Sequence, residues 1–193
     1  MAQEISPQGP QQDCEFEPDQ RILSNSVARL APLWLLCLMD RLDRRILELM
    51  QKDASLPAAE IAEKVGLSKA PCWRRIRRLH DEGVIRRIVA VLDPKALNVG
   101  TTVFVTVKAA SHSSAWFEQF ARTVRDIPEV VELYRLSGNV DYLMRICVPG
   151  IDAYDEVYKR LIANCDFLDV SASFSLETIK ATTALPLTYL GGE

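Results

Sequence analysis

The sequence predicts an α+β fold, in which an N-terminal winged helix-turn-helix unit precedes a C-terminal βαββαβ domain. A turn-and-helix signal at residues 65–79 and an alternation of strand-like and helix-like segments after Gly100 lead to this prediction. The third observation is the distribution of charge. Residues 40–92 carry twelve Lys and Arg against eight acidic side chains, a net of +4, whereas residues 1–39 and 93–193 carry −3 and −4. A basic unit beside an acidic one is typical of a protein that contacts a polyanion with one domain only.

The N-terminal unit is expected to contain three helices and a wing. Apolar side chains recur at helical spacing over residues 40–51, 57–65 and 69–79, so each range predicts a helix. Residues 84–92 are rich in β-branched side chains and are expected to form the β wing. An Asp-Pro pair then breaks the strand, and residues 93–100 are typical of a linker. The predicted DNA-binding domain therefore covers residues 39–92.

The predicted third helix has two chemically different faces. Cys72, Ile76 and Leu79 recur at i, i+4 and i+7 and form an apolar face. A glycine permits the sharp turn before this helix, and the Ser68 hydroxyl is expected to accept hydrogen bonds from the free helix amides. Residues 69–87 carry seven Lys and Arg against two acidic side chains, a net of +5. A helix with one apolar face and one cationic face is typical of DNA recognition.

The cationic face predicts contacts with double-stranded DNA, because the N-terminal part of a recognition helix reaches base edges while flanking cations reach phosphates. The residues expected to contact the major groove are Ser68, Lys69, Ala70, Pro71, Trp73, Arg74 and Arg77, and those expected to contact phosphates are Arg78, Arg86 and Arg87. Two positions have a second interpretation. Arg75 flanks the apolar face and could instead pair with an acid of another helix. Trp73 could be a packing residue on the flank of the helix or a sugar-phosphate contact. A cationic face that is merely solvated is the general alternative.

The residues after the linker predict a ferredoxin-like domain over residues 101–193. Its elements follow the order β-α-β-β-α-β. Strands are expected over residues 101–109, 130–137, 141–148 and around 170–174, and helices over residues 114–124 and around 154–161. Apolar residues stand on both faces of some strands, Leu133 beside Tyr134 and Leu143 beside Met144. Because two helices cover one face only, we expect the other face to pack on a second copy, giving at least a homodimer.

Other functional classes find little support. The five cysteines are widely spaced, without a CxxC pair or Cys/His ligand spacing, so no metal site or disulfide framework is predicted, and reduced thiols in a cytoplasmic protein are expected. No apolar run has the length of a membrane span. His80 and His112 lack the partners of a nucleophile, phosphate-loop or metal site, so neither an enzyme nor a cofactor is expected. Residues 1–38 are predicted to be poorly ordered or a mis-called extension.

Five motifs spread along the chain resemble those of one family of bacterial and archaeal regulators. They are DRLDRRIL (residues 40–47), VGLS (65–68), PCWRRIRRL (71–79), AVLDP (90–94) and SGNVDYL (137–143). With a basic winged helix-turn-helix and an acidic βαββαβ domain, the chain is similar to the Lrp/AsnC, or feast/famine, transcriptional regulators, whose C-terminal domain is RAM/ACT-like. Four stretches resemble the branch that senses cysteine and controls cysteine detoxification, namely PCWRR (71–75), HSS (112–114), YDEVYKRL (154–161) and IKATTALP (179–186).

The resemblance implies a sequence-specific transcriptional regulator of amino-acid metabolism or transport genes that responds to a small amino acid, with cysteine as the first candidate. It also implies dimerisation through the sheets and further assembly, up to an octamer. The implied effector site is the loop that contains Ser137, Gly138, Asn139, Asp141 and Tyr142. Backbone amides of Gly138 and Asn139 can meet a carboxylate, and Asp141 can pair with an ammonium group.

Alternatives remain open for the loop and for the function. The loop could be a hairpin turn in which Asp141 caps its own backbone. The chain could be a DNA-organising oligomer without a ligand response, or less plausibly a ferredoxin-like enzyme.

Overall fold

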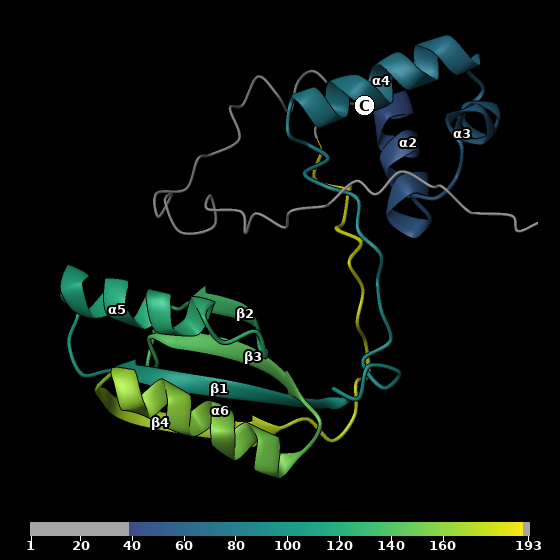
Figure 1. Ribbon diagram of the computed structural model, residues 1–193. Coiled ribbons are helices and arrows are strands. Elements are labelled where there is room, and N and C mark those ends of the chain that lie inside the picture. The colour runs from purple at the N-terminus through teal and green to yellow at the C-terminus, as the bar shows by residue number, and fades with distance from the viewer. Residues whose placement is uncertain (1–38, 191–193) are drawn as a thin grey trace, which may run out of the picture.

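The computed structural model describes residues 39–190 (Figure 1). The elements are α2 (Arg41–Lys52), α3 (Ala58–Val65), α4 (Lys69–Asp81), β1 (Thr101–Ala109), α5 (Ser114–Arg125), β2 (Val130–Arg135), β3 (Tyr142–Val148), α6 (Ile151–Asn164) and β4 (Phe167–Phe174). Three helices are therefore followed by β-α-β-β-α-β, which confirms the predicted α+β fold. The prediction for residues 1–38 lies outside the described residues.

The helices α2, α3 and α4 enclose a small hydrophobic core. Its buried members are Met39, Ile46, Leu47, Ile61, Ala62, Val65, Cys72, Ile76 and Leu79. Between α3 and α4 the chain turns at Gly66, whose φ of 74° lies in the left-handed region that favours glycine. The Leu67 amide closes the end of α3 by donating to the Ala62 carbonyl at 2.8 Å. The predicted helix-turn-helix is thus present, with its apolar face turned inward.

The start of α4 differs from the sequence prediction. Ser68 stands at the N-cap, but its hydroxyl accepts no hydrogen bond from the helix amides. An N-cap side chain bonds the amide of the second or third helical residue. The third residue here is Pro71, which has no N–H to donate. The expected capping role of Ser68 is therefore wrong, and its hydroxyl is not committed to the helix.

The structure assigns no strand to residues 84–92, so the strand expected for the β wing is not present in the described chain. The segment leaves α4 with the Ile85 amide donating to the Leu79 carbonyl at 3.0 Å. Beyond that point Ile88, Val89 and Val91 are 55%, 61% and 77% exposed. β-branched composition favours a strand only where a neighbouring strand supplies hydrogen bonds, and the sheet of the described chain contains only β1 to β4.

The C-terminal domain is a four-stranded antiparallel sheet in the order β2-β3-β1-β4. Helices α5 and α6 both cover the same face of this sheet (Figure 1). The central strand β1 turns Val103, Val105 and Val107 toward the helices, and all three are fully buried. The ferredoxin-like arrangement that the sequence predicts is confirmed.

The opposite face of the sheet has no helix over it in the described chain. It is mixed in character, with Phe104 and Tyr134 41% and 50% exposed. Between them lies an ion pair in which Arg145 Nη2 is 2.6 Å from Glu132 Oε1. The Arg145 hydrogen bond, together with Tyr134, holds the pKa of Glu132 below its usual value against the effect of burial. We call this surface the open sheet face.

Substitution of Phe120 tests the core of the C-terminal domain. This side chain is fully buried and stacks on Trp116 with ring centroids 5.0 Å apart. Phe120→Ala should lower the free energy of unfolding by about 3–5 kcal/mol, because it leaves a cavity that the sheet and α5 cannot close. Val131→Ala, at a side chain that is 47% exposed, is the matched control and should change stability little. Urea unfolding measures the free energy of unfolding of both variants, and equal losses would contradict a special role of Phe120 in the core.

Candidate nucleic-acid interface and effector loop

Helix α4 is anchored on one side and exposed on the other. Cys72 and Leu79 are fully buried, as predicted, and Ile76 is 6% exposed. The opposite side carries the candidate DNA-contacting residues, of which Ser68, Lys69, Ala70, Trp73, Arg74 and Arg77 are exposed and Pro71 is half-buried. Trp73 is 54% exposed, so it lies outside the buried core, and its role on the flank of the helix stays a prediction. The structure therefore brings the predicted major-groove residues together at one surface, around the N-terminal half of α4.

A buried carboxylate links α4 to α2. Asp43 is fully buried and receives Arg75 Nη1 at Oδ1, 2.9 Å away, and Arg78 Nη2 at Oδ2, 2.5 Å away. Its Oδ2 also accepts from the Asp40 amide at 3.1 Å, as part of a capping box at the start of α2. All the charge of the carboxylate is thus compensated inside the domain. The alternative for Arg75, an ion pair with an acid of another helix, is confirmed.

The second carboxylate of this cluster lies at the surface. Asp40 Oδ2 is 2.8 Å from Arg75 Nη1. Burial alone would raise the pKa of Asp40, but the hydrogen bond from the Asp43 amide and the Arg75 guanidinium hold that pKa below its usual value. For Arg75, burial alone would lower the pKa, but the hydrogen bonds to Asp43 and Asp40 raise that pKa above its usual value. Arg75 is therefore a fixed cation that serves the fold.

The remaining arginines differ in how far they are committed within the chain. Arg78 is shared between Asp43 and Glu82, with Nε 3.7 Å from the latter, and its side chain is 38% exposed. Arg77 makes only a surface pair with Asp81 at 3.9 Å. Arg74 makes no ion pair within residues 39–190 and is exposed. The phosphate contact expected of Arg78 stays a prediction, and it would have to coexist with the Asp43 bond.

The wing arginines lie apart from the helix. Arg86 and Arg87 are exposed and follow the end of α4 in the segment that lacks a strand. Exposure of both side chains is compatible with the expected phosphate contacts, which stay a prediction.

The predicted effector loop joins β2 to β3 and is tied to β1. The Leu136 amide donates to the Asp141 carbonyl at 2.8 Å, and the Asp141 amide donates to the Val107 carbonyl at 2.9 Å. The Asp141 side chain accepts the Ala109 amide at Oδ2, at 2.9 Å. Asp141 therefore caps the backbone of β1 rather than that of its own hairpin.

The other side chains of this loop divide into two groups. Ser137, Gly138 and Asn139 are exposed, and Gly138 has a φ of 129° that favours glycine. Tyr142 is only 5% exposed, and its ring lies 4.9 Å from that of Phe120. Burial raises the pKa of its phenol. Tyr142 supports the loop from the core, while the first three residues present backbone and side chain to solvent.

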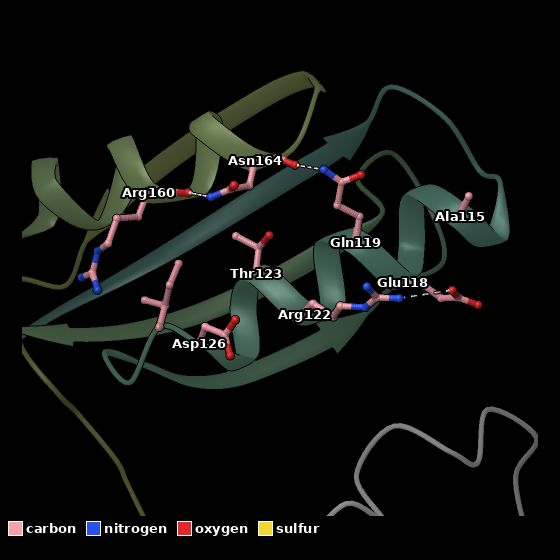
Figure 2. Close-up of a pocket in the computed structure, with 9 residues that line it drawn as sticks. Ala115, Glu118, Gln119, Arg122, Thr123, Asp126, Arg160 and Asn164 are labelled. Atoms are coloured by element: carbon pink, nitrogen blue, oxygen red, sulfur yellow. Dashed lines mark hydrogen bonds and ion pairs between the residues drawn. The ribbon is translucent and has the colours of Figure 1, made fainter.

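A polar groove lies elsewhere, between α5 and α6. Figure 2 shows its lining, and its volume is about 620 Å³. The side chains in it include Gln119, Arg122, Asp126 and Arg160. None of the predicted effector residues lines it. The sequence gives no sign of this groove, because its residues read as the ordinary solvent faces of two amphipathic helices.

Comparisons with known proteins agree with this division of the chain. Residues 39–86 match the model of a winged helix-turn-helix DNA-binding domain, and residues 102–185 match the model of the Lrp/AsnC ligand binding domain. The chain belongs to the Lrp/AsnC family. The glutamate uptake regulatory protein of Zymomonas mobilis is 47% identical over 77% of this chain and 91% of its own length. The transcriptional activator DecR of Escherichia coli is 44% identical over 78% of this chain and 99% of its own.

Solved structures of the family share the same fold. An AsnC family regulator from Agrobacterium tumefaciens has a TM-score of 0.76 and 55% identity, covering 79% of this chain and 99% of its own. A regulator from Neisseria meningitidis in complex with L-methionine has a TM-score of 0.75 and 35% identity with the same coverage. These relatives are transcriptional regulators, not enzymes. Their names do not confirm a cysteine-responsive branch. Within residues 39–190, no helix is both long and apolar enough to cross a membrane.

Removal of the Asp43 carboxylate tests the link between α2 and α4. Asp43→Ala leaves Arg75 and Arg78 without their buried partner, so the free energy of unfolding of the N-terminal domain should fall by about 3–5 kcal/mol. Asp81→Ala is the control, because its pair with Arg77 is exposed and is worth at most about 1 kcal/mol. Chemical unfolding followed by far-UV circular dichroism compares the two, and similar losses would refute a special role for Asp43.

Proposed function

We propose that this protein is a sequence-specific DNA-binding transcriptional regulator whose C-terminal domain responds to a small amino acid, with cysteine as the first candidate. One observation carries the DNA-binding part. Helix α4 is fixed from behind through Asp43 while Lys69 and Arg74 stand exposed at its front. Cations that are held in place but not neutralised inside the chain are suited to a polyanion. Membership of the Lrp/AsnC family supports the same function.

The proposed DNA contacts follow from the position of α4. Its N-terminal half enters the major groove, where Arg74 and Arg77 meet base edges and the free Ser68 hydroxyl bonds a base or a phosphate. Arg78, Arg86 and Arg87 neutralise phosphates on either side. The proposed DNA-binding domain is residues 39–92, joined through residues 93–100 to a ligand-binding and oligomerisation domain over residues 101–193.

The proposed effector site is the loop of residues 137–142. The exposed amides of Gly138 and Asn139 are available to a carboxylate. The Ala109 amide donates to Asp141 Oδ2, and Asp141 Oδ1 lies 4.0 Å from His112 Nε2, so one carboxylate oxygen can still turn to an ammonium group. The L-methionine complex of the Neisseria regulator supports an amino acid as the class of effector. The genes controlled would then be those of amino-acid metabolism or transport.

We further propose a homodimer that assembles through the open sheet face and associates into higher oligomers, up to an octamer. Phe104 on the inner strand β1 and Tyr134 on the edge strand β2 are half-exposed aromatic side chains of this face, and helices cover only the other face of the sheet. Burial of such a face against a second copy removes apolar area from water. A dimer also presents two copies of α4, as a two-fold symmetric operator requires. Such a protein acts on DNA in the cytoplasm.

Replacement of the two base-reading arginines tests the DNA-binding proposal. Each such arginine contributes about 1–3 kcal/mol, so Arg74→Ala with Arg77→Ala should weaken binding to a selected operator on the order of a hundredfold or more. Arg122→Ala, an exposed arginine of α5, is the matched control and should leave affinity unchanged. Fluorescence anisotropy with operator and random duplexes gives both affinities. Full operator affinity in the double variant would remove α4 as the reading helix.

Neutralising the wing arginines should have a different signature. Arg86→Ala with Arg87→Ala should weaken operator and random DNA by similar factors, because phosphates carry no sequence information. The slope of the logarithm of the binding constant against the logarithm of salt concentration should become shallower by about 2, one unit for each phosphate contact. An unchanged slope would show that this segment does not touch DNA.

Titration with amino acids tests the effector proposal. Cysteine, methionine, glutamate and leucine are added in turn to the protein–operator complex, and DNA affinity and oligomer size are measured. Asp141→Asn keeps an oxygen for the Ala109 amide but removes the negative charge, so the half-maximal effector concentration should rise at least about tenfold. Asp155→Asn, exposed on α6, is the control. If no amino acid changes either property, the chain is a DNA-organising protein without this response.

A further inference from the structure

The chain after β4 returns to the helix-turn-helix domain. Figure 1 shows this segment running from the sheet domain back to α2, beside the linker that leads the opposite way. Leu187 and Leu190 pack against the hydrophobic core that α2, α3 and α4 enclose. They lie more than 130 residues along the chain from their partners on α2. The two domains are therefore connected twice, once by the covalent linker and once by this contact.

Polar contacts hold the returning backbone on α2. Gln51 binds both sides of one residue, with Leu185 N donating to its Oε1 at 2.6 Å and its Nε2 donating to the Leu185 carbonyl at 3.2 Å. About two turns earlier on the same helix, Arg44 Nη2 donates to the Leu190 carbonyl at 2.7 Å. The segment of residues 185–190 thus lies along α2 and is bound at both of its ends. We call it the C-terminal strap.

The strap is distinct from the stretch that precedes it. Residues 176–184 are exposed throughout, and Leu176 and Ile179 are 99% and 90% exposed. The strap is instead docked, with Leu187 and Leu190 half-buried. Thr183, Leu185 and Leu187 also line one wall of a cavity that residues 84–91 border on another side. The strap therefore touches α2 and faces the segment that carries Arg86 and Arg87.

We propose that the C-terminal strap is a positioning element, which holds the DNA-binding domain in a fixed orientation relative to the sheet domain. The helix it binds is the same helix that fixes α4 through Asp43. The strap thus connects the end of β4 to the recognition helix by way of α2. This inference rests on the proposed function, because an orientation matters only if two DNA-binding domains of one oligomer engage one operator.

The consequence for DNA binding is one of effective concentration. A domain on a single flexible linker samples many orientations, so engagement of a second half-site by the same dimer becomes less favourable. A second attachment restricts those orientations before DNA is met. The strap should therefore raise affinity for a duplex with two half-sites and leave affinity for one half-site unchanged.

Two leucines of the strap provide a matched pair of variants. Leu187 is half-buried against the helix-turn-helix core, whereas the Leu185 side chain is 73% exposed and only its backbone is bound. Leu187→Asp should release the strap, and Leu185→Asp should not. Hydrogen exchange of the full-length protein reports release directly, because the Leu185 amide is held by Gln51. Gln51→Ala releases the same amide from the other side and serves as the second variant should Leu187→Asp fail to fold.

DNA affinities are then measured on duplexes selected from a random pool by the unmodified protein, with one half-site or with two. We expect Leu187→Asp and Gln51→Ala to lose about tenfold in the preference for two half-sites, with affinity for one half-site unchanged. Rapid exchange at Leu185 in the unmodified protein would overturn the docking itself. Loss of docking with an unchanged preference would overturn the positioning role. If the unmodified protein binds no DNA, the proposed function fails, while hydrogen exchange still decides whether the strap is docked.

Discussion

The arrangement of the DNA-binding domain depends on one buried carboxylate. Among residues 39–190, Asp43 is the only charged residue that is buried. Apolar contacts between three short helices tolerate some sliding, because the hydrophobic effect has no direction. A buried charge does not, since displacement of α4 by even a fraction of a turn would leave either Asp43 or its guanidinium partners without compensation. Ile76 and Leu79 hold α4 close to α2, and Asp43 specifies the rotation at which it is held.

The arginines of α4 accordingly serve two purposes that their order along the chain separates. Arg75 points into the domain and forms ion pairs with Asp43 and Asp40. Its neighbour Arg74 is exposed and makes no ion pair in the described chain. Successive residues of a helix point about 100° apart. Two adjacent arginines can therefore point in different directions, one holding the helix in place through ion pairs and the other facing solvent. Arg78 lies between the two roles, half-exposed and bound to Asp43. Net charge alone therefore overstates the number of cations that are free to meet DNA.

The sequence predicts the elements well and their distant partners poorly. Helical spacing of residues such as Ile46 and Ile76, and alternation along β1, are local signals, and the helices and strands follow them. The strand expected at residues 84–92 did not form because β-branched residues need a neighbouring strand, which the described chain does not supply there. The Ser68 cap was wrong because its hydroxyl accepts from no helix amide, and Pro71 removes one of the two amides that a cap could use. The Ala109 partner of Asp141 and the docking of Leu187 on α2 join residues far apart in sequence, which periodicity cannot reveal. The position of Asp43 three residues after Asp40 is a local sign of a capping box, but it gives no sign of burial.

The path of the C-terminal segment has a practical consequence for work with this protein. Leu190 is held by Arg44 of α2, and Leu187 packs on the same domain. Residues 187–190 thus belong by their contacts to the helix-turn-helix domain, although most of the residues that precede them belong to the sheet domain. A fluorescent label attached within residues 187–190 would therefore report on the helix-turn-helix domain and would add its bulk next to α2. A label intended to report on the sheet domain is better attached to an exposed side chain of α6.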